Sequence, residues 1–232
     1  MITIRKGIDR GHANHGWLDA RHTFSFANYY HPDQMGFRAL RVINEDHINP
    51  GAGFPPHPHQ EMEIITYVLE GVLAHKDSTG GGGVITPGMV QYMSAGSGVT
   101  HSEFNASDTD PLHLYQIWLM PNVRGGAPRY EEREIGDARN GALKLVASSD
   151  GRDGSFAIRQ NADLYASVVK EGEALSHKFE PGRYGWLQIV RGGVELPDGI
   201  MMQAGDGARI ESEDTISLTA LADTEILLFD LP

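Results

Sequence analysis

Two pairs of side chains that commonly bind metal ions stand out in this chain of 232 residues. One pair is His57 and His59, the other is His101 and Glu103, and a single residue separates the members of each pair. Residues i and i+2 of a β-strand project from the same face. If both segments are strands that face each other in a small barrel, three imidazoles and one carboxylate converge. This donor set suits a divalent first-row metal such as iron, and it can leave coordination positions open for a substrate.

The residues around the first pair allow two backbone conformations. Pro55, Pro56 and Pro58 cannot donate to a sheet ladder, which places this segment at the start or the edge of a strand. The same prolines allow a polyproline II conformation with three residues per turn, in which i and i+2 do not share a face. The spacing alone leaves both conformations open, and it leaves structural and metal-binding roles for the histidines open as well.

Carboxylates near the two pairs add further candidates. Glu61 and Glu63 keep the strand parity of His57 and His59, so either could point toward the same centre. Glu63 is a candidate fifth ligand, or an acceptor that orients one of the imidazoles. Glu103 is a candidate ligand and also the candidate catalytic residue, because a carboxylate can accept the proton of a bound hydroxyl.

The chain has 11 histidines, so some close spacings are expected by chance. His113 lies in an apolar run, residues 112–118, which predicts a buried core strand. A cluster near the N-terminus lacks a carboxylate partner at strand spacing, and we expect capping or packing roles for its members, His12, His15 and His22. Three further histidines adjoin turns, and we expect them to face solvent: His31, His47 and His75.

Short apolar runs rich in Val, Ile, Leu and aromatic residues dominate the chain, separated by Gly, Pro and Asp. Hydrophobic residues make up 40% of the sequence, which is enough for a sizeable core. Few segments repeat apolar residues at helical spacing. Many short strands at regular spacing favour an all-β sandwich or closed barrel. We predict strands at residues 39–44, 63–69, 112–120, 143–147, 164–170, 185–190 and 225–231.

A change in composition predicts two domains of similar size. Residues 121–141 are rich in Gly, Pro and charged side chains, which is typical of a solvated connector. We therefore predict an N-terminal metal-binding domain at residues 1–125, a linker at 126–141 and a C-terminal domain at 142–232.

The two halves are weakly alike in sequence, which suggests a duplicated β-barrel. Residues 67–72 resemble residues 189–194, and residues 95–101 resemble residues 204–210. The second half has one histidine, His177, so it cannot repeat the ligand set. In this alignment the four candidate ligands stand opposite Phe179, Pro181, Ile210 and Ser212.

The composition excludes several classes of function. The formal net charge of −12 argues against direct binding to nucleic-acid phosphates and gives no support for an anionic membrane surface as a partner. Without cysteine the chain can form no disulfide, zinc–thiolate site or iron–sulfur cluster. No apolar run has the length of a signal peptide or a membrane span. We therefore expect a soluble cytoplasmic protein.

The two ligand pairs lie in segments that resemble the sequence motifs of the cupins. The first motif is G-x5-H-x-H, then three or four residues, then E-x6-G, and it is matched by Gly51, His57, His59 and Glu63, with Gly71 one residue late. The second motif, G-x5-P-x-G-x2-H-x3-N, is matched in part by Gly98, His101 and Asn105. Gly96 replaces its proline, and Val90 replaces its leading glycine.

A closer resemblance is to pirin and the bacterial pirin-like proteins. It rests on residues 10–30, 57–71, 94–105 and 112–121, which cover most of the first half. The resemblance implies a bicupin of two stacked β-barrels, of the double-stranded β-helix or jelly-roll type, with few short helices. It also implies one metal ion in the first barrel, and in this family the glutamate at the position of Glu63 is generally not a ligand. The ligands that it implies are His57, His59, His101 and Glu103.

Several pirin-like proteins are quercetin 2,3-dioxygenases, so the resemblance implies an enzyme that opens the heterocycle of flavonols such as quercetin with O2. A flavonol 3-hydroxyl would bind the metal and Glu103 would remove its proton. Reaction with O2 would then give a depside and carbon monoxide. Fe(II) is our first choice of cofactor, with Cu, Mn, Ni, Co and Zn as alternatives.

The alternative function is a non-enzymatic, redox-sensing regulator that depends on its metal and binds a protein partner. The resemblance to vertebrate pirin, a transcriptional coregulator, implies this second reading. With so acidic a chain, any contact with DNA would be indirect.

Overall fold

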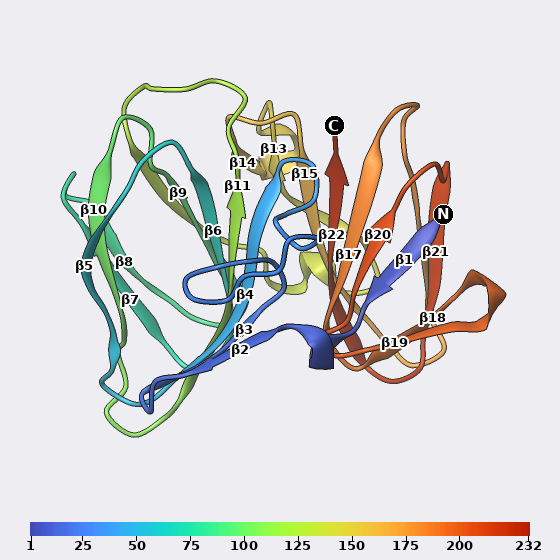
Figure 1. Ribbon diagram of the computed structural model, residues 1–232, viewed down its shortest axis with the longest axis horizontal. Helices are drawn as coiled ribbons and strands as arrows, with labels where there is room; N and C mark the ends of the chain where they lie inside the picture. The colour runs from blue at the N-terminus through green and yellow to red at the C-terminus, as the bar shows by residue number, and fades with distance from the viewer. The chain divides into compact units, whose positions relative to one another are not determined.

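Almost every regular element of the structure, a computed structural model, is a β-strand (Figure 1). The structure describes all residues from Met1 to Pro232. The helical segments are four short 3-10 helices, η1 (Gly7–Asp9), η2 (Gly136–Arg139), η3 (Arg152–Gly154) and η4 (Pro197–Gly199). None of them has the length and apolar character that crossing a membrane requires. The prediction of an all-β fold with few short helices is confirmed.

The strands gather into two compact units. The N-terminal unit consists of Gly11–Gly136 with Ile158–Gln160, and the C-terminal unit consists of Met1–Arg10, Asp137–Ala157 and Asn161–Pro232. The segment predicted as a linker, residues 126–141, contains a strand that pairs within the N-terminal unit. The domain limits at residues 125 and 142 stay a prediction.

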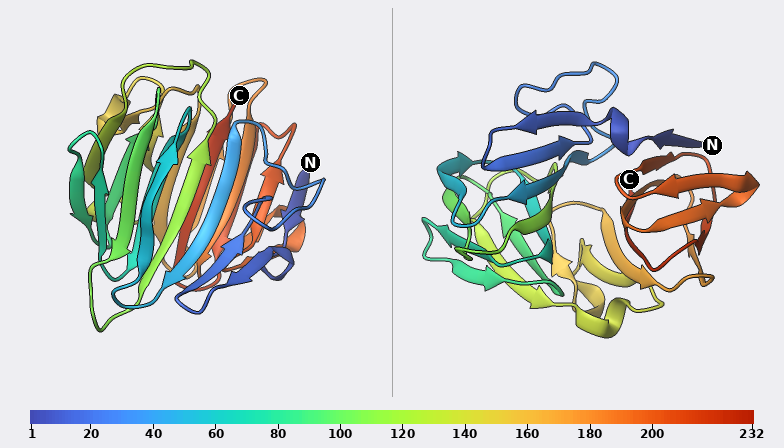
Figure 2. Two further views of the ribbon diagram at one scale, coloured as in Figure 1. Left: turned by 60° about the vertical axis from the view of Figure 1, so that its left-hand side comes forward. Right: turned by 90° about the horizontal axis from the view of Figure 1, so that it is seen from below.

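Two sheets make up the N-terminal unit, and Figure 2 follows its strands from two further sides. The larger sheet has the strand order β12 (Arg129–Glu134), β9 (Met89–Ser94), β6 (Glu63–Glu70), β11 (Leu112–Leu119), β4 (Leu40–Ile48), β3 (Leu18–His22) and β2 (Gly11–Asn14). The smaller sheet has the order β5 (Gly53–His59), β10 (Val99–Asn105), β7 (Leu73–Asp77) and β8 (Gly82–Ile85).

Local sequence explains the strands that carry this unit. β6 is a nearly continuous run of β-branched and aromatic residues, and all but its last residue are buried, as expected for a strand with both faces covered. β4 and β11 pair along their whole lengths. Gly71, which follows β6, has a positive φ of 80° and sits where a Cβ would meet the backbone of Pro111. Only glycine suits this turn.

The C-terminal unit also contains a larger and a smaller sheet. The larger has the order β1 (Ile2–Arg5), β20 (Gly207–Ile210), β17 (Tyr184–Arg191), β22 (Thr224–Leu231), β15 (Asp163–Val169), β13 (Lys144–Ser148) and β14 (Phe156–Ala157). The smaller has the order β16 (Ala174–Lys178), β21 (Thr215–Ala220), β18 (Gly193–Leu196) and β19 (Ile200–Gln203). The N-terminal strand β1 therefore belongs to this unit, beside β20 (Figure 1).

The strand orders of the two units correspond. β9, β6, β11 and β4 match β20, β17, β22 and β15, and the order β5, β10, β7, β8 matches β16, β21, β18, β19. One part of the predicted alignment is wrong: β10 corresponds to β21, whereas residues 204–210 lead into β20, the counterpart of β9. The glycine-rich turns before β20 and after β9 are alike because both are tight turns, although their places in the fold differ.

Candidate metal centre

A β-bulge on an edge strand positions the first histidine pair. β5 lies at the edge of its sheet and pairs with β10, with His101 directly opposite His57. The register then shifts, so that Pro55 and Pro56 stand opposite the single residue Ser102. Prolines are tolerated at edges and bulges because they have no N–H to donate. The segment is thus a strand and not a polyproline helix.

Three imidazoles converge as the spacing predicts. One ring nitrogen from each of His57, His59 and His101 lies within 4.8 Å of the other two. The ring centroids of His57 and His101 are 4.4 Å apart, and His59 is 4.8 Å from each of them. The Nδ1–H of His57 donates to the carbonyl of Pro55 at 2.8 Å, which leaves Nε2 as the free donor atom. His101 Nε2 is buried and has no hydrogen-bond partner.

The electrostatic environment keeps two of these rings, those of His59 and His101, neutral. Burial, followed by the neighbouring His101 and His57, lowers the pKa of His59 to about 4. Burial, followed by His57 and His75, lowers the pKa of His101 to about 3. A metal ion binds the unprotonated ring, so both side chains are in the ligand form at neutral pH.

Glu103 is buried beside this cluster and held by side-chain donors. Gln116 Nε2 donates to its Oε2 at 2.8 Å, and Gln91 Nε2 donates to its Oε1 at 3.3 Å. Trp118 Nε1 in turn donates to Gln116 Oε1 at 3.2 Å, which fixes the amide so that its NH2 faces the carboxylate. One carboxylate oxygen of Glu103 lies within 4.8 Å of ring nitrogens of His101 and His75.

His75 was expected to face solvent, and that expectation is wrong: its side chain is fully buried. On β7, His75 and Asp77 stand opposite Glu103 and His101 of β10. Asp77 Oδ2 accepts from His75 Nε2 at 3.4 Å, and His75 Nδ1 lies 3.4 Å from His101 Nδ1. With one proton on each ring, His101 Nδ1 donates to His75, and His101 Nε2 is left for a metal. His75-Lys76-Asp77 has the same i, i+2 spacing as the other pairs, so a signal was present in the sequence.

Neither Glu61 nor Glu63 contributes to the cluster, so the second role suggested for Glu63 is also wrong. Glu61 accepts from the backbone N–H of Gly125 at 2.8 Å. Glu63 accepts from Ser94 Oγ at 2.6 Å, from the hydroxyl of Tyr92 and from a backbone N–H. The strand parity is lost because β5 ends at His59 and the chain turns at Glu61, whose φ is 53°.

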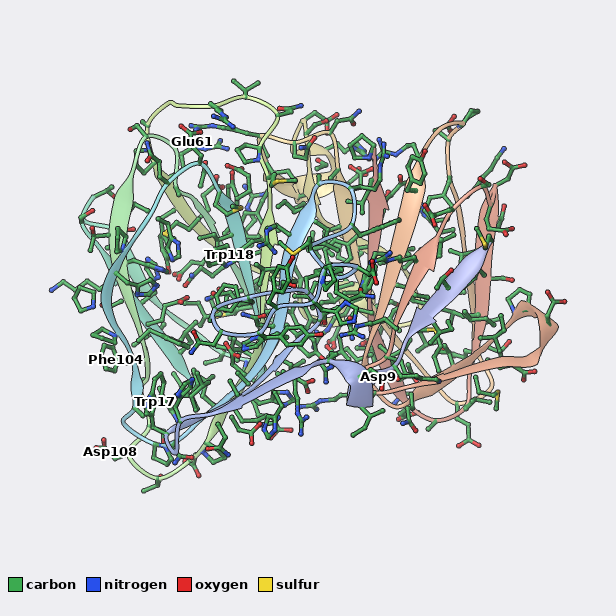
Figure 3. The ribbon with its side chains drawn as sticks, viewed as in Figure 1. Asp9, Trp17, Glu61, Phe104, Asp108 and Trp118 are labelled. Carbon is green, nitrogen blue, oxygen red and sulfur yellow. The ribbon has the colours of Figure 1, made fainter.

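A cavity of about 230 Å³ opens next to the candidate ligands. His57, His59, Glu103 and the aromatic ring of Trp118, which is labelled in Figure 3, lie in its wall. Trp118 packs edge-on against His59, with a centroid distance of 4.8 Å. An outer cavity of about 500 Å³ shares part of this wall and adds aromatic side chains. The shared residues are Leu18, Ala20, His22, Phe26 and Phe54.

Sequence reasoning also missed Asp46, which lines the inner cavity. Its side chain is buried, and its Oδ1 has no hydrogen-bond partner. Burial, followed by the charges of Glu103 and Glu45, raises the pKa of Asp46 to about 7. Asp46 lies in an unremarkable stretch of β4, so only the sheet register could reveal its place.

The other histidines differ partly from expectation. His22 packs as predicted, with its Nδ1 2.9 Å from Asn44 Oδ1. His12 pairs with the carboxylate of Asp19 at 3.1 Å. His113 lies in the central strand β11 of its sheet, as predicted for a core strand. Its side chain is mostly buried, and its Nε2 lies 3.0 Å from Glu45 Oε1.

The fold and the site together define a cupin protein with a candidate metal centre in one of its two units. Residues 4–119 match the pirin family, and residues 145–231 match a family described as the quercetinase C-terminal cupin domain. The chain belongs to the pirin family, and the predicted bicupin fold is confirmed, although the sheets do not close into complete barrels.

Named relatives cover the whole chain. It is 52% identical to a quercetin 2,3-dioxygenase of Escherichia coli (strain K12), over 100% of this chain and 99% of the relative. It is 44% identical to a pirin-like protein of Caulobacter vibrioides, over 97% of this chain and 98% of the relative. The crystal structure of YhhW from Escherichia coli matches with a TM-score of 0.96 at 50% identity, covering 100% and 98% of the two chains. A nickel(II) complex of that bacterial pirin matches with a TM-score of 0.95 at 50% identity, covering 100% and 99%.

Proposed function

We propose that this protein is a metal-dependent dioxygenase that opens the heterocycle of flavonols such as quercetin with O2, using one metal ion in the N-terminal unit. The observation that carries the proposal is the cluster of His57, His59 and His101 beside the carboxylate of Glu103 and an open cavity. The name of the relative in Escherichia coli and the nickel(II) complex of a bacterial pirin support it.

The side chains fit a divalent first-row ion. The buried Nε2 of His101 lacks a partner, and a buried polar atom is costly unless something binds it. Three imidazoles and one carboxylate form a donor set that suits Fe(II), the ion we propose, and also its neighbours in the series. His57, His59, His101 and Glu103 would hold it. When bound, the ion polarises a substrate hydroxyl and lowers the pKa of that hydroxyl.

Glu103 removes the proton of the flavonol 3-hydroxyl. The hydrogen bonds from Gln116 and Gln91 fix the carboxylate before substrate arrives, and a positioned base contributes about 10²–10⁴-fold to a rate. Two hydrogen bonds, from Trp118 to Gln116 and from Gln116 to Glu103, also connect the base to the cavity wall, because Trp118 lines the cavity itself.

The cavities fit a flat aromatic substrate of several rings. The inner cavity of about 230 Å³ is smaller than the roughly 300 Å³ at which ligand pockets usually begin. The outer cavity of about 500 Å³ extends it with Trp17 and Tyr29. The hydroxylated ring would reach the histidines, and the remaining ring would lie between aromatic side chains, which favour stacked or edge-on contact.

A loading and turnover experiment tests the proposal. Metal-free protein is loaded with Fe(II) in the absence of O2 and then mixed with quercetin and O2, while flavonol absorbance and released carbon monoxide are followed. At saturating metal, we expect Glu103→Gln to turn over at least about 100-fold more slowly than the wild type. His57→Ala should bind the ion at least about tenfold more weakly, since loss of an outer-shell partner alone costs 10–100-fold.

His177→Ala is the matched control, because His177 pairs with a carboxylate, Asp230, at 2.8 Å in the C-terminal unit. It should change neither metal binding nor turnover. A metal-loaded protein that turns over no flavonol would favour the regulator with a protein partner. A protein that binds no divalent metal at all would contradict both functions.

A further inference from the structure

A second group of metal-binding side chains lies on the face of the larger N-terminal sheet that points away from the cavity. Asn44 and Asp46 of β4 line the cavity, so Glu45 and His47, which alternate with them, project from the opposite face. His113 of β11 is the direct cross-strand neighbour of His47. The three side chains therefore come from two adjacent strands.

Their donor atoms are close enough to share one ion. One atom from each of Glu45, His47 and His113 lies within 4.8 Å of the other two. His113 Nε2 is 3.0 Å from Glu45 Oε1. The rings of His47 and His113 are stacked, with centroids 3.9 Å apart and an interplanar angle of 21°, so the exposed ring of His47 would turn for both in-plane lone pairs to meet at one ion. Glu45 and His113 are mostly buried while His47 is exposed, so an ion can enter from solvent.

The surroundings of this group favour a cation. Asp19 of β3 stands opposite His47, and Glu70 of β6 stands opposite His113. With Glu45, three carboxylates thus lie near two imidazoles, and the charges of all three act on His47. Arg21 of β3, which stands opposite Glu45, offsets one of these charges. Burial, followed by His113, nevertheless lowers the pKa of His47. A lowered pKa favours the unprotonated ring, which is the form that binds a metal ion.

We propose that Glu45, His47 and His113 bind a second divalent transition-metal ion of the zinc type. Two imidazoles and one carboxylate with a position left for water make up a common zinc donor set. The ion would replace the hydrogen bond between Glu45 and His113 and would join β4 to β11. The site is separate from the proposed dioxygenase centre, and its existence does not depend on that function.

Counting bound ions tests this proposal. Metal-free full-length protein is dialysed against Zn²⁺, and the bound zinc is measured by mass spectrometry. We expect two ions per chain for the wild type. His57→Ala should lose only the ion beside Glu103, and His47→Ala should lose only the ion that Glu45 and His113 also bind. The affinity of this second ion site for Zn²⁺ should fall more than about 100-fold.

His31→Ala serves as the control, because His31 is also exposed and belongs to neither group. Glu45→Gln gives a second variant that alters a side chain without truncating it, and it should also weaken the binding of Zn²⁺ at this second site. Thermal melts of the metal-free variants check that each one folds. The proposal is overturned if the wild type binds one ion that His57→Ala removes, or if His47→Ala and Glu45→Gln keep two ions at wild-type affinity.

Discussion

Replacing His75 by leucine should weaken metal binding at the candidate centre beside His101, although His75 is not one of the proposed ligands. His75 lies between Asp77 and His101, with a distance of 3.4 Å on either side. Hydrogen bonds from Thr79, Gly81 and His75 keep the pKa of Asp77 below its ordinary value, although burial alone would raise it. The carboxylate of Asp77 is thus charged and accepts a hydrogen bond from the Nε2–H of His75. His75 in turn orients His101.

Loss of such an outer partner costs about 10–100-fold in metal affinity. Because both distances of 3.4 Å are long for hydrogen bonds, we expect His75→Leu to fall near tenfold, or about 1.4 kcal/mol. The dissociation constant is measured by competition with a chelator, and the Co²⁺ ligand-field spectrum reports the geometry. If the three residues act as one chain, the double variant with Asp77→Asn should be no weaker than His75→Leu alone, which is non-additive behaviour.

His177→Leu is the control for loss of a buried histidine that pairs with a carboxylate. It should leave the dissociation constant unchanged. Metal affinity within twofold of the wild type in His75→Leu would refute the reasoning, and so would an equal loss in both variants. Fully additive losses in the double variant would show that Asp77 acts on the centre by another route.

Three further outcomes follow from the same geometry. Because the pKa of Asp46 is raised to about 7, the folded state holds its proton longer than the unfolded state, so the unfolding free energy of metal-free protein should fall as pH rises from about 4 to 7. Asp46→Asn should remove this fall, which amounts to roughly 3 kcal/mol between pH 5 and pH 8, and urea unfolding at these two pH values shows whether it does. Trp118→Phe removes the donor that orients Gln116, so steady-state assays should find a kcat several-fold lower at unchanged metal content. An unchanged kcat would mean that this hydrogen bond does not help to position Glu103. In Gly53→Ala the new Cβ would lie 2.2 Å from the carbonyl oxygen of Glu103, so calorimetry should record a lower Tm together with weaker metal binding, and a wild-type Tm would mean that β5 moves freely.

The candidate centre could be predicted from sequence wherever the signal was local. Period-two spacing places His57 with His59 and His101 with Glu103 once each segment is a strand. Which strands then lie side by side depends on register across the sheet. The spacing of His75 and Asp77 was therefore visible but could not be assigned to this centre, and Asp46 carried no local signal at all. The parity argument failed for Glu63 for a related reason, since a turn at Glu61 interrupts the strand between the histidines and the glutamate.

The strands themselves were predicted well because their apolar runs are continuous. The run at 225–231 became β22 (Thr224–Leu231), buried along its full length. The role of the first ten residues could not be predicted, because β1 pairs with β20, about two hundred residues later in the chain. No local pattern carries information on a partner at that distance, and the hydrophobic alternation of β1 is too short to select one.

The two units share a strand order, but the interior of one is apolar and nearly filled, whereas the interior of the other is polar and holds a cavity. In the C-terminal unit Phe179, Ile216 and Leu218 pack into one apolar cluster, and the void near His177 measures only about 10 Å³. In the N-terminal unit the corresponding strands β5 and β10 carry the histidines beside a cavity of about 230 Å³. Each unpartnered buried polar atom costs about 1–3 kcal/mol, so the metal-free N-terminal unit carries a penalty at His101 Nε2 that a bound ion removes. Metal should therefore raise the Tm of the N-terminal unit and leave that of the C-terminal unit unchanged, which places the ligand-dependent part of the stability in the unit that holds the proposed metal centre.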